Sequence, residues 1–277
     1  MNRIVRAILP PIIRRQIRGV LQVVHYRARI LAGLIPPLTP PSWLHNVGGG
    51  DFHAIGEQQF ECLKSISGVK PNDAVIDIGC GTARLARPLT SFLVQGSYDG
   101  IDIVKESIEW CQQTYTPRFP NFHFYFSDLY NKVYNPGGKL KASEYRFPFD
   151  DSSFDFAILT SVFTHMLPAD MANYVGEIRR VLKPGGRCYA TFFLLVPESE
   201  KLIKEQRSSR NFQYQFGECL IENKDFPEGA IGYRESHIRK LYDKESLQIV
   251  EPIHYGSWCG RSDGRDYQDI IIADRES

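Results

Sequence analysis

The 277-residue sequence contains no uninterrupted apolar run of the about 18 to 20 residues that a helix needs to cross a bilayer. It also lacks the apolar region and small-residue cleavage site of a secretory signal. Its six cysteines form no close pairs, so their spacing indicates neither a zinc site nor a redox dithiol. We therefore expect a protein of a reducing, cytoplasmic compartment, and we assign no metal ligands.

The chain as a whole has little net charge. It holds 33 basic and 32 acidic residues, a formal charge of +1. The first fifty residues contain seven arginines and no acidic residue, which leaves 26 basic against 32 acidic residues in the rest. The chain after residue 50 thus has more acidic than basic residues, whereas nucleic-acid-binding proteins typically have an extended basic surface. We therefore expect no nucleic-acid partner.

The N-terminal segment differs from the rest in composition. From Ile4 to Ile35, isoleucine, leucine and valine are interspersed with arginine, and Pro36 to Pro41 form a proline-rich link. This pattern predicts a basic amphipathic arm over residues 1–41. One interpretation is that residues 1–35 bind an anionic membrane surface, which would place the protein at the inner face of the membrane. The other is that the arm packs on the remaining chain or on a second subunit, and the oligomeric state is open.

A glycine turn follows the first apolar strand. The stretch Val75 to Ala83 reads Val-Ile-Asp-Ile-Gly-Cys-Gly-Thr-Ala, and a helix is expected from Thr82 to Leu93. Gly79 and Gly81 can adopt backbone angles that other residues avoid, and they leave room for a ligand against bare backbone. An ordinary tight connection between strand and helix has the same pattern, so the turn alone does not decide the function.

Further elements follow the turn in a regular order. Three more apolar strands end on or near polar residues, and an amphipathic helix leads through a Lys-Pro-Gly-Gly turn into a fifth strand. Acids at the ends of such strands accept hydrogen bonds from ribose hydroxyls in dinucleotide sites. The predicted segments are Tyr98–Ile103 with Asp102, Phe122–Asp128, Phe154–Ser161, helix Met171–Leu182, turn Lys183–Gly186 and strand Arg187–Leu195.

With these motifs in this order, residues 52 to 196 resemble the class I S-adenosylmethionine-dependent methyltransferases. The resemblance implies that Asp102 holds the ribose and that Asp128, with Leu129 beside it, contacts the adenine. One departure is Ala83, which stands where many members have a third glycine; its small size should preserve the packing. The cofactor-binding residues that the resemblance implies are Asp77, Gly79, Cys80, Gly81, Asp102, Ile103, Asp128, Leu129 and Thr160.

The predicted fold is α/β, a Rossmann-like doubly wound sheet, mostly parallel with an antiparallel last strand and with helices on both faces. Residues 42–277 form this methyltransferase domain, with insertions at about 129–150 and 197–230. The second insertion lies where the family often places a lid over the acceptor. The remaining predicted elements are helix Glu57–Ile66, helix Ser236–Leu247, and a closing hairpin of strands Ile249–Tyr255 and Tyr267–Ala273.

His165 follows the fourth strand, so it is the candidate general base, because histidine titrates near neutral pH. A structural histidine that caps a helix or holds the loop is the alternative. Tyr130 and Tyr134 in the first insertion offer hydrogen-bonding and stacking groups for a polar ring, although such loops also stabilise themselves. His254 and Trp258 are the other candidate acceptor contacts.

The function predicted from these residues is O-methylation of a hydroxyl on a small-molecule, glycan-like or lipid-linked acceptor, with S-adenosylmethionine as cofactor. Methyl transfer needs orientation of the acceptor and removal of its proton, and no metal is required in principle. A nicotinamide-dependent oxidoreductase is the alternative enzyme. Its Gly-x-Gly-x-x-Gly fingerprint has a third glycine at the position where this sequence has Arg84. A non-catalytic binding protein that keeps the fold is the third interpretation.

Overall fold

The structure, a computed structural model, describes residues 11–44 and 49–276, with side chains from residue 19 onward. The chain divides into two compact units, Met1–Gly48 and Gly49–Ser277. The boundary lies a few residues beyond the predicted division at residue 41. The part of the arm before residue 11 lies outside the described residues.

The described part of the first unit contains a long helix, α2 (Pro11–Leu31), and a short 3-10 helix, η1 (Ser42–Leu44). The segment after α2 folds back along it, because the Tyr26 hydroxyl donates a hydrogen bond to the Thr39 carbonyl. The Tyr26 and Trp43 rings also meet edge to face at 5.8 Å. One side of α2 is thereby covered by its own continuation. No helix in the described part of the chain is long and apolar enough to span a membrane.

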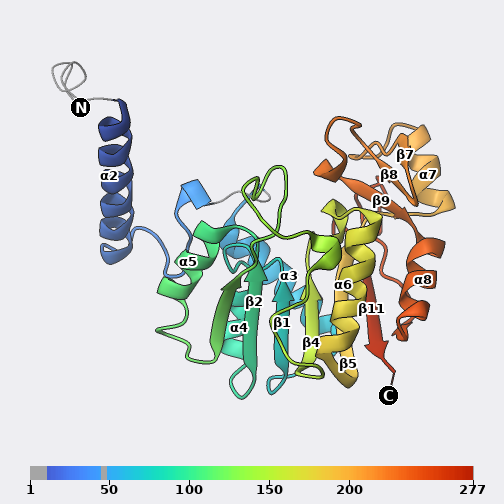
Figure 1. The fold of residues 1–277 in the computed structure, drawn as a ribbon, viewed down its shortest axis with the longest axis horizontal. Helices are drawn as coiled ribbons and strands as arrows, with labels where there is room; N and C mark the ends of the chain where they lie inside the picture. Colours follow the sequence, from blue (N-terminus) through green and yellow to red (C-terminus); the bar gives the residue numbers. More distant parts are fainter. Residues whose placement is uncertain (1–10, 45–48, 277) are drawn as a thin grey trace. The chain divides into compact units, whose positions relative to one another are not determined.

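The second unit is built on a seven-stranded sheet (Figure 1). Its strand order is β10-β11-β5-β4-β1-β2-β3, and β11 runs antiparallel to both of its neighbours while the other pairs are parallel. The Rossmann-like prediction with an antiparallel last strand is therefore confirmed. The strands are β1 (Ala74–Ile78), β2 (Ser97–Asp102), β3 (Phe122–Phe126), β4 (Phe154–Leu159), β5 (Leu182–Phe192), β10 (Leu247–Ile249) and β11 (Asp269–Arg275).

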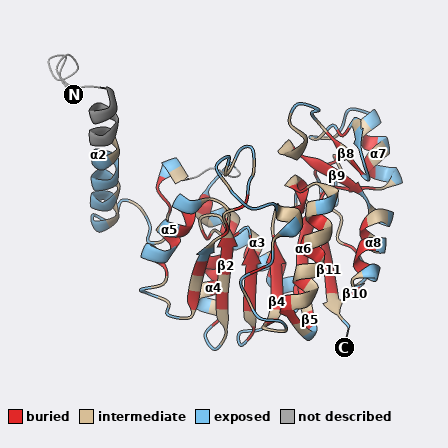
Figure 2. Cartoon of the chain, viewed as in Figure 1, coloured by how far each residue is buried: buried red, intermediate tan, exposed pale blue. Residues whose placement is uncertain are grey.

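Helices cover both faces of the sheet (Figure 1). The helices α6 and α8 contact each other on one face, α3 and α4 contact each other on the opposite face, and α5 packs on β2 and β3. The strands are almost wholly buried between these layers (Figure 2). The helices are α3 (Phe52–Ser67), α4 (Ala86–Phe92), α5 (Lys105–Thr114), α6 (Pro168–Val181) and α8 (Glu235–Lys244).

A second sheet was not predicted. The insertion after the fifth strand, expected as a lid, contains α7 (Pro197–Lys204) and two strands, β7 and β8, of a four-stranded sheet of order β6-β9-β8-β7, and the other two strands flank it. These strands are only two to four residues long, too short for the alternation that predicts a strand. The second sheet lies beyond the carboxyl ends of β4 and β5 (Figure 1). Its strands are β6 (Leu194–Leu195), β7 (Tyr214–Phe216), β8 (Cys219–Ile221) and β9 (Ile231–Arg234).

Several helix boundaries differ from the prediction, and α6 starts at Pro168 instead of Met171. The helix α3 starts at Phe52 instead of Glu57, because the Asp51 side chain caps it by accepting a hydrogen bond from the Ala54 N–H at 2.7 Å. The helix α4 starts at Ala86 instead of Thr82, because Ala83 adopts a left-handed φ of +61° that a helix excludes. Helix α8 ends at Lys244, and Ser246 with φ +55° turns the chain into β10.

Two strand predictions need correction. The strand β5 begins at Leu182, and its pairing with β4 jumps from Leu182 to Arg187, so the Lys183–Gly186 turn bulges out of the strand. The predicted strand Ile249–Tyr255 is misplaced, because β10 spans Leu247–Ile249 and shares only Ile249 with it; Pro252, which has no N–H to donate, lies in the part that does not continue the strand. Beyond it, only His254 pairs with Ile270.

Candidate functional site

The glycine turn and the polar residues after β2, β3 and β4 lie at one edge of the sheet. The strands β1, β2, β3 and β4 are parallel, so their carboxyl ends meet there. Ligands of open parallel sheets bind in the crevice beyond these carboxyl ends. The register of the sheet therefore brings together segments that lie far apart in sequence.

The turn after β1 is shaped by glycine. Gly79 has φ +81°, and a Cβ at this position would collide with the Val162 side chain. Gly81 has φ +53°, and nothing lies within 4 Å of where its Cβ would be. The Cys80 side chain points the other way, since its Sγ lies 2.8 Å from a Cβ placed on Gly100. A ligand at this turn can therefore meet only the backbone of residues 79–81 on the open side.

Asp102 links this turn to the end of β2. One carboxylate oxygen accepts a hydrogen bond from the Gly81 N–H at 2.8 Å, and the other accepts one from the Val104 N–H at 2.8 Å. Burial raises the pKa of Asp102, while these backbone N–H groups oppose the rise. A carboxylate oxygen has more than one lone pair, so both oxygens can also accept ribose hydroxyls. The loop thus fixes the orientation of this acid without using up its acceptors.

Asp77 lies inside the sheet below the turn and is 3% exposed. The Tyr98 hydroxyl donates a hydrogen bond to it at 2.6 Å. Burial raises the pKa of Asp77 to about 7. The hydrogen bond from Tyr98 lowers this pKa, and the negative charge of Asp102 raises it. Asp77 is therefore partly protonated at neutral pH and is held in one orientation by Tyr98.

Asp128 leads into a closed loop over residues 129–140. Its carboxylate accepts a hydrogen bond from Asn135 Nδ2 at 3.4 Å and lies 3.8 Å from Lys139 Nζ. Leu129 is 2% exposed and belongs to the main core, so less of it faces a ligand than the resemblance implies. Ile103 and Thr160 are half-buried at the same edge. All of the predicted cofactor residues thus gather at this edge, while Cys80 offers only its backbone.

Tyr134 connects the cofactor side of this edge to His165. Burial raises the pKa of the Tyr134 hydroxyl, and the charge of Asp102 raises it further, so the two groups lie within electrostatic reach. The Tyr134 ring meets the His165 ring edge to face, with centroids 6.4 Å apart. Two residues predicted for different roles from different loops are therefore neighbours beside the ribose acid.

His165 ends a short 3-10 helix, η3 (Phe163–His165), and is half-buried. Its Nδ1 lies 2.9 Å from the Glu228 carbonyl oxygen. A carbonyl only accepts hydrogen bonds, so Nδ1 carries the proton and Nε2 presents a lone pair. Burial lowers the pKa of His165 below 6.5, although the Glu228 carbonyl opposes this effect. The imidazole is therefore neutral at pH 7 with a defined basic nitrogen.

Three other candidate acceptor contacts are placed differently. Tyr130 is exposed on the 129–140 loop, and His254 is half-buried where it pairs with Ile270. Trp258 is completely buried, and its Nε1 donates a hydrogen bond to Asp269 at 2.7 Å. Trp258 packs against Phe193 and Phe212 in a second core, so its prediction as an acceptor contact is wrong for this conformation.

Sequence reasoning missed the contribution of the second insertion. Glu228 lies in the 3-10 helix η4 (Pro227–Gly229) and acts through its backbone carbonyl, which no side-chain pattern reveals. The Lys132 ammonium donates a hydrogen bond to the Asp225 carbonyl at 3.1 Å, which joins the two insertions. Positive φ at Ser161, +60°, could be expected only from the structure. Both insertions therefore border the His165 side of the site.

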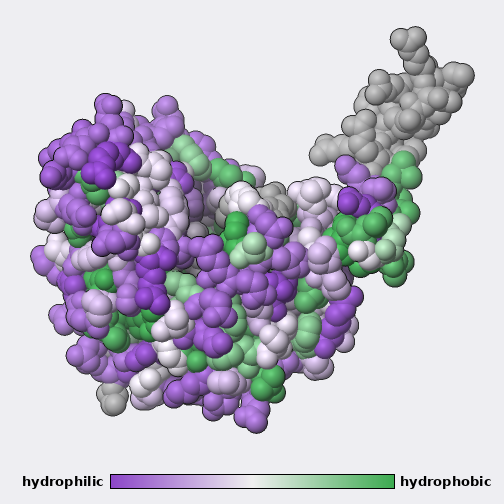
Figure 3. All heavy atoms as spheres, turned by 180° about the vertical axis from the view of Figure 1, so that it is seen from behind, coloured by the Kyte–Doolittle hydropathy of each residue, from purple (hydrophilic) through white to green (hydrophobic). Residues whose placement is uncertain are grey.

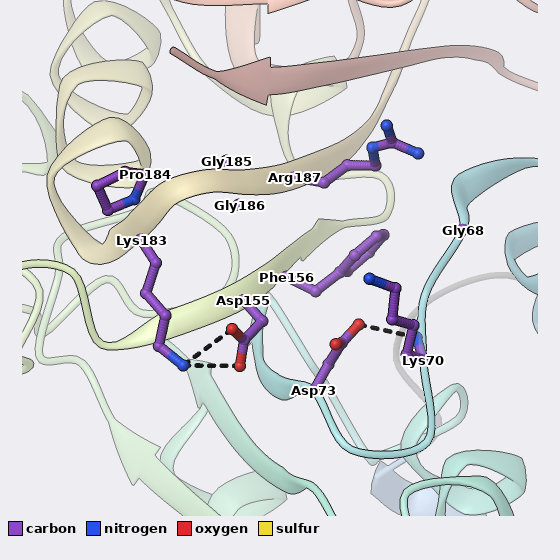
Figure 4. Close-up of a pocket in the computed structure, with 10 residues that line it drawn as sticks. All are labelled: Gly68, Lys70, Asp73, Asp155, Phe156, Lys183, Pro184, Gly185, Gly186 and Arg187. Carbon is purple, nitrogen blue, oxygen red and sulfur yellow. Dashed lines mark hydrogen bonds and ion pairs between the residues drawn. The ribbon is translucent and has the colours of Figure 1, made fainter. Parts of the chain in front are cut away.

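A pocket of about 260 Å³ lies elsewhere (Figure 4). It is lined by residues at the amino ends of β1 and β4 and by the bulge of β5. Its Lys183 ammonium pairs with Asp155 at 2.8 and 2.9 Å, and Asp73 accepts a hydrogen bond from the Lys70 backbone N–H at 2.8 Å. The pocket thus lies at the sheet edge opposite the glycine turn and is separate from the candidate site.

No group of three or more His, Cys, Asp or Glu residues in the described part of the chain is arranged to hold a metal ion. The residues at the carboxyl edge instead suit a ligand with a ribose and an adenine.

Comparison with known proteins agrees with this geometry. Residues 76–190 match a family model described as a methyltransferase domain. Residues 76–190 therefore form a methyltransferase domain. The family uses S-adenosylmethionine, and the open backbone at Gly81 with the fixed carboxylate of Asp102 fits this cofactor.

Individual relatives cover the domain only in part. The phthiotriol/phenolphthiotriol dimycocerosates methyltransferase of Mycobacterium tuberculosis strain H37Rv is 31% identical over 126 residues, 46% of this chain and 39% of that protein. The chain thus spans about two fifths of the length of the curated relatives of this name. A solved structure from Pyrococcus horikoshii OT3 has a TM-score of 0.57 at 17% identity, covering 83% of this chain and 94% of that one.

A structure of a S-adenosylmethionine-dependent methyltransferase from Methanosarcina mazei has a TM-score of 0.50 at 21% identity, covering 75% of this chain and 94% of that one. At these identities the structural likeness shows the fold. The residues of the site carry the rest of the functional argument.

Proposed function

We propose that this protein transfers a methyl group from S-adenosylmethionine to a hydroxyl group of a small-molecule, glycan-like or lipid-linked acceptor. The observation that carries the proposal is the position of Tyr134, which lies within electrostatic reach of Asp102 and against the ring of His165. Tyr134 is thereby a neighbour of both the candidate ribose acid and the candidate base. An acceptor held beside Tyr134 would lie near the cofactor.

His165 is the proton acceptor in this proposal. S-adenosylmethionine supplies an activated methyl group on a sulfonium. The chain's own task is to orient the acceptor hydroxyl and to take its proton onto His165 Nε2. The Glu228 carbonyl holds the opposite ring nitrogen and therefore fixes which nitrogen is basic. Because burial lowers the pKa of His165, the ring is neutral and ready to accept a proton at physiological pH.

The acceptor class is supported by the loop that borders His165. The 129–140 loop has three apolar or aromatic side chains that are about half exposed: Tyr130, Val133 and Leu140. The surface of this loop is therefore partly apolar and aromatic. Tyr130 and Tyr134 also offer hydroxyl groups to a polar ring. A relative's name refers to a triol, a compound that has hydroxyl groups. These observations favour a hydroxylated acceptor with an apolar part.

We also propose that the protein works in a reducing, cytoplasmic compartment. All six of its cysteines are free thiols. Disulfides are rare in cytosolic proteins and common in secreted ones. A lipid-linked acceptor would also give a role to residues 1–35 under the interpretation in which they bind an anionic membrane surface.

Two measurements test the proposed function. Thermal unfolding is recorded with S-adenosylhomocysteine and with NAD; stabilisation by the first alone is expected, and stabilisation by NAD alone would favour the oxidoreductase. Cell-extract fractions are then incubated with methyl-labelled S-adenosylmethionine. Label in an alkali-stable ether product is expected. Cofactor binding without label in any fraction would favour a non-catalytic binding protein.

A further inference from the structure

One face of α2 exposes a row of apolar side chains. Val20, Leu21, Val24 and Leu31 are between 57% and 87% exposed. Val20, Val24 and Leu31 are four and seven residues apart, a spacing that puts them on one face of a helix with Leu21 at its border. Figure 3 shows hydrophobic and hydrophilic residues side by side on the visible surface of the first unit. This row is the apolar face of α2.

The continuation of α2 does not cover the apolar face. It covers a different side of the helix, where Tyr26 contacts Thr39 and Trp43. Tyr26 lies two residues beyond Val24, so its side chain points about 200° away around the helix axis. The chain after α2 therefore packs against one side of the helix and leaves the apolar face exposed.

Charge shows what kind of surface fits the apolar face. Arg27 and Arg29 are exposed on the described part of α2. Arg29 lies nine residues from Val20, about 180° around the helix, whereas Arg27 lies seven residues from Val20 and therefore within about 20° of it, on the apolar face. An arginine on such a face can lay its stem along the apolar surface and keep its charge in the headgroup region. No acidic residue occurs in the first fifty residues.

From this arrangement we propose that the apolar face of α2 docks on the surface of an anionic lipid bilayer, with the helix in the plane of the membrane. A protein partner would need acidic residues placed to match the arginines, whereas an anionic bilayer offers negative charge and an apolar interior at every point. The helix does not cross the bilayer, because the arginines and glutamine interrupt its apolar residues. The docking is independent of methyl transfer.

The test uses the full chain and vesicles of phosphatidylcholine alone or in an equimolar mixture with phosphatidylglycerol. Sedimentation with the mixed vesicles and not with phosphatidylcholine is expected, and added salt should weaken it. The variant with Val20, Leu21, Val24 and Leu31 changed to Gln should lose sedimentation. Arg27→Gln should weaken binding by about fivefold, since each basic residue near an anionic surface contributes on that scale. Val94→Gln, at an exposed position in the second unit, should bind like the unchanged chain.

A matched pair of tryptophan probes shows which side of α2 enters the lipid. Val24→Trp lies on the apolar face, and Gln22→Trp, at another exposed position, lies on the opposite side of the same helix. Quenching by brominated acyl chains, measured as the change on adding vesicles, should be several-fold larger for Val24→Trp. Equal quenching of the two, or no sedimentation with phosphatidylglycerol, would overturn the proposal.

Two controls separate this result from other causes. Stabilisation by S-adenosylhomocysteine should be the same in every variant, which would show that the second unit is folded. This control does not require the protein to turn over a substrate. If the unchanged chain is a dimer in solution and the four-Gln variant is a monomer, the apolar face is a contact between two copies, and the membrane proposal is wrong.

Discussion

His165 Nδ1 donates a hydrogen bond to the carbonyl oxygen of Glu228 at 2.9 Å, across 63 residues of sequence. This bond joins the end of the fourth strand to the insertion that follows the fifth. It holds the imidazole in the tautomer whose Nδ1 carries the proton, which leaves Nε2 as the basic nitrogen. The predictions below start from this contact.

Replacement of His165 by Ala should lower turnover by about a hundredfold or more, the usual size of a general-base contribution. Binding of S-adenosylhomocysteine should stay within a fewfold of the unchanged protein, because the cofactor residues lie on other loops. Isothermal titration and steady-state kinetics measure the two effects. Near-normal turnover in the variant would show that His165 has a structural role.

The pH profile should report the same residue. A base must be neutral to act, so kcat/KM should rise with pH and reach a plateau above the pKa of His165, which burial lowers below 6.5. The His165→Ala variant should lack this rise. An identical acidic limb in both proteins would assign the titration to another group.

Asp77 should make stability depend on pH. Its folded pKa of about 7 is above its unfolded value of 3.8, so the native state binds the proton more tightly. The stability contributed by the protonated form is complete below 3.8 and is lost as pH rises through about 7. The unfolding free energy of the unchanged protein minus that of Asp77→Asn should therefore fall as the pH rises from 3.8 to about 7. Urea titrations at a series of pH values measure it, and a constant difference would contradict the assignment.

Trp258→Phe should separate stability from acceptor binding. The substitution removes the hydrogen bond to Asp269 and some packing in a closed core, so we expect a loss of about 2 to 4 kcal/mol in unfolding free energy. KM for the acceptor should not change, because Trp258 has no exposed surface. A raised KM without destabilisation would restore Trp258 as an acceptor contact.

Ala83 should tolerate glycine better than valine. Its φ of +61° costs a residue with a Cβ about 1 to 2 kcal/mol, and relief of this cost in Ala83→Gly is offset by the lost methyl and a more flexible unfolded chain. We therefore expect Ala83→Gly to lie within about 1 kcal/mol of the unchanged protein in thermal unfolding. Ala83→Val should lose about 2 kcal/mol or more, because a branched side chain is forced into a buried left-handed position. Equal stability of the two variants would contradict this account.

The sheet and the cofactor edge could be predicted from the sequence because their signals are local. Each strand is a short apolar run, and Asp102 and Asp128 are read at the ends of such runs. The second sheet could not be predicted in this way. Its strands are two to four residues long, and β6 pairs with β9 across the whole insertion, so their stability depends on tertiary packing and leaves little local pattern.

The direction of individual side chains could not be predicted from the sequence either. Trp258 looked like an acceptor contact because it lies in a polar loop after a strand, yet Asp269 and two phenylalanines bury it. The left-handed conformation of Ala83 shortened the predicted helix, since a backbone angle of this kind is visible in a sequence only when glycine marks it.

By itself the sequence determined the order of strands and helices, the glycine turn at Gly79 and Gly81, and the acids that follow successive strands. These features depend on spacing and on the intrinsic geometry of each residue type. The tertiary structure decided which loops meet: Tyr134 beside His165, and His165 against the Glu228 carbonyl. Contacts between residues distant in sequence depend on the register of the sheet and the packing of insertions, which no local pattern encodes.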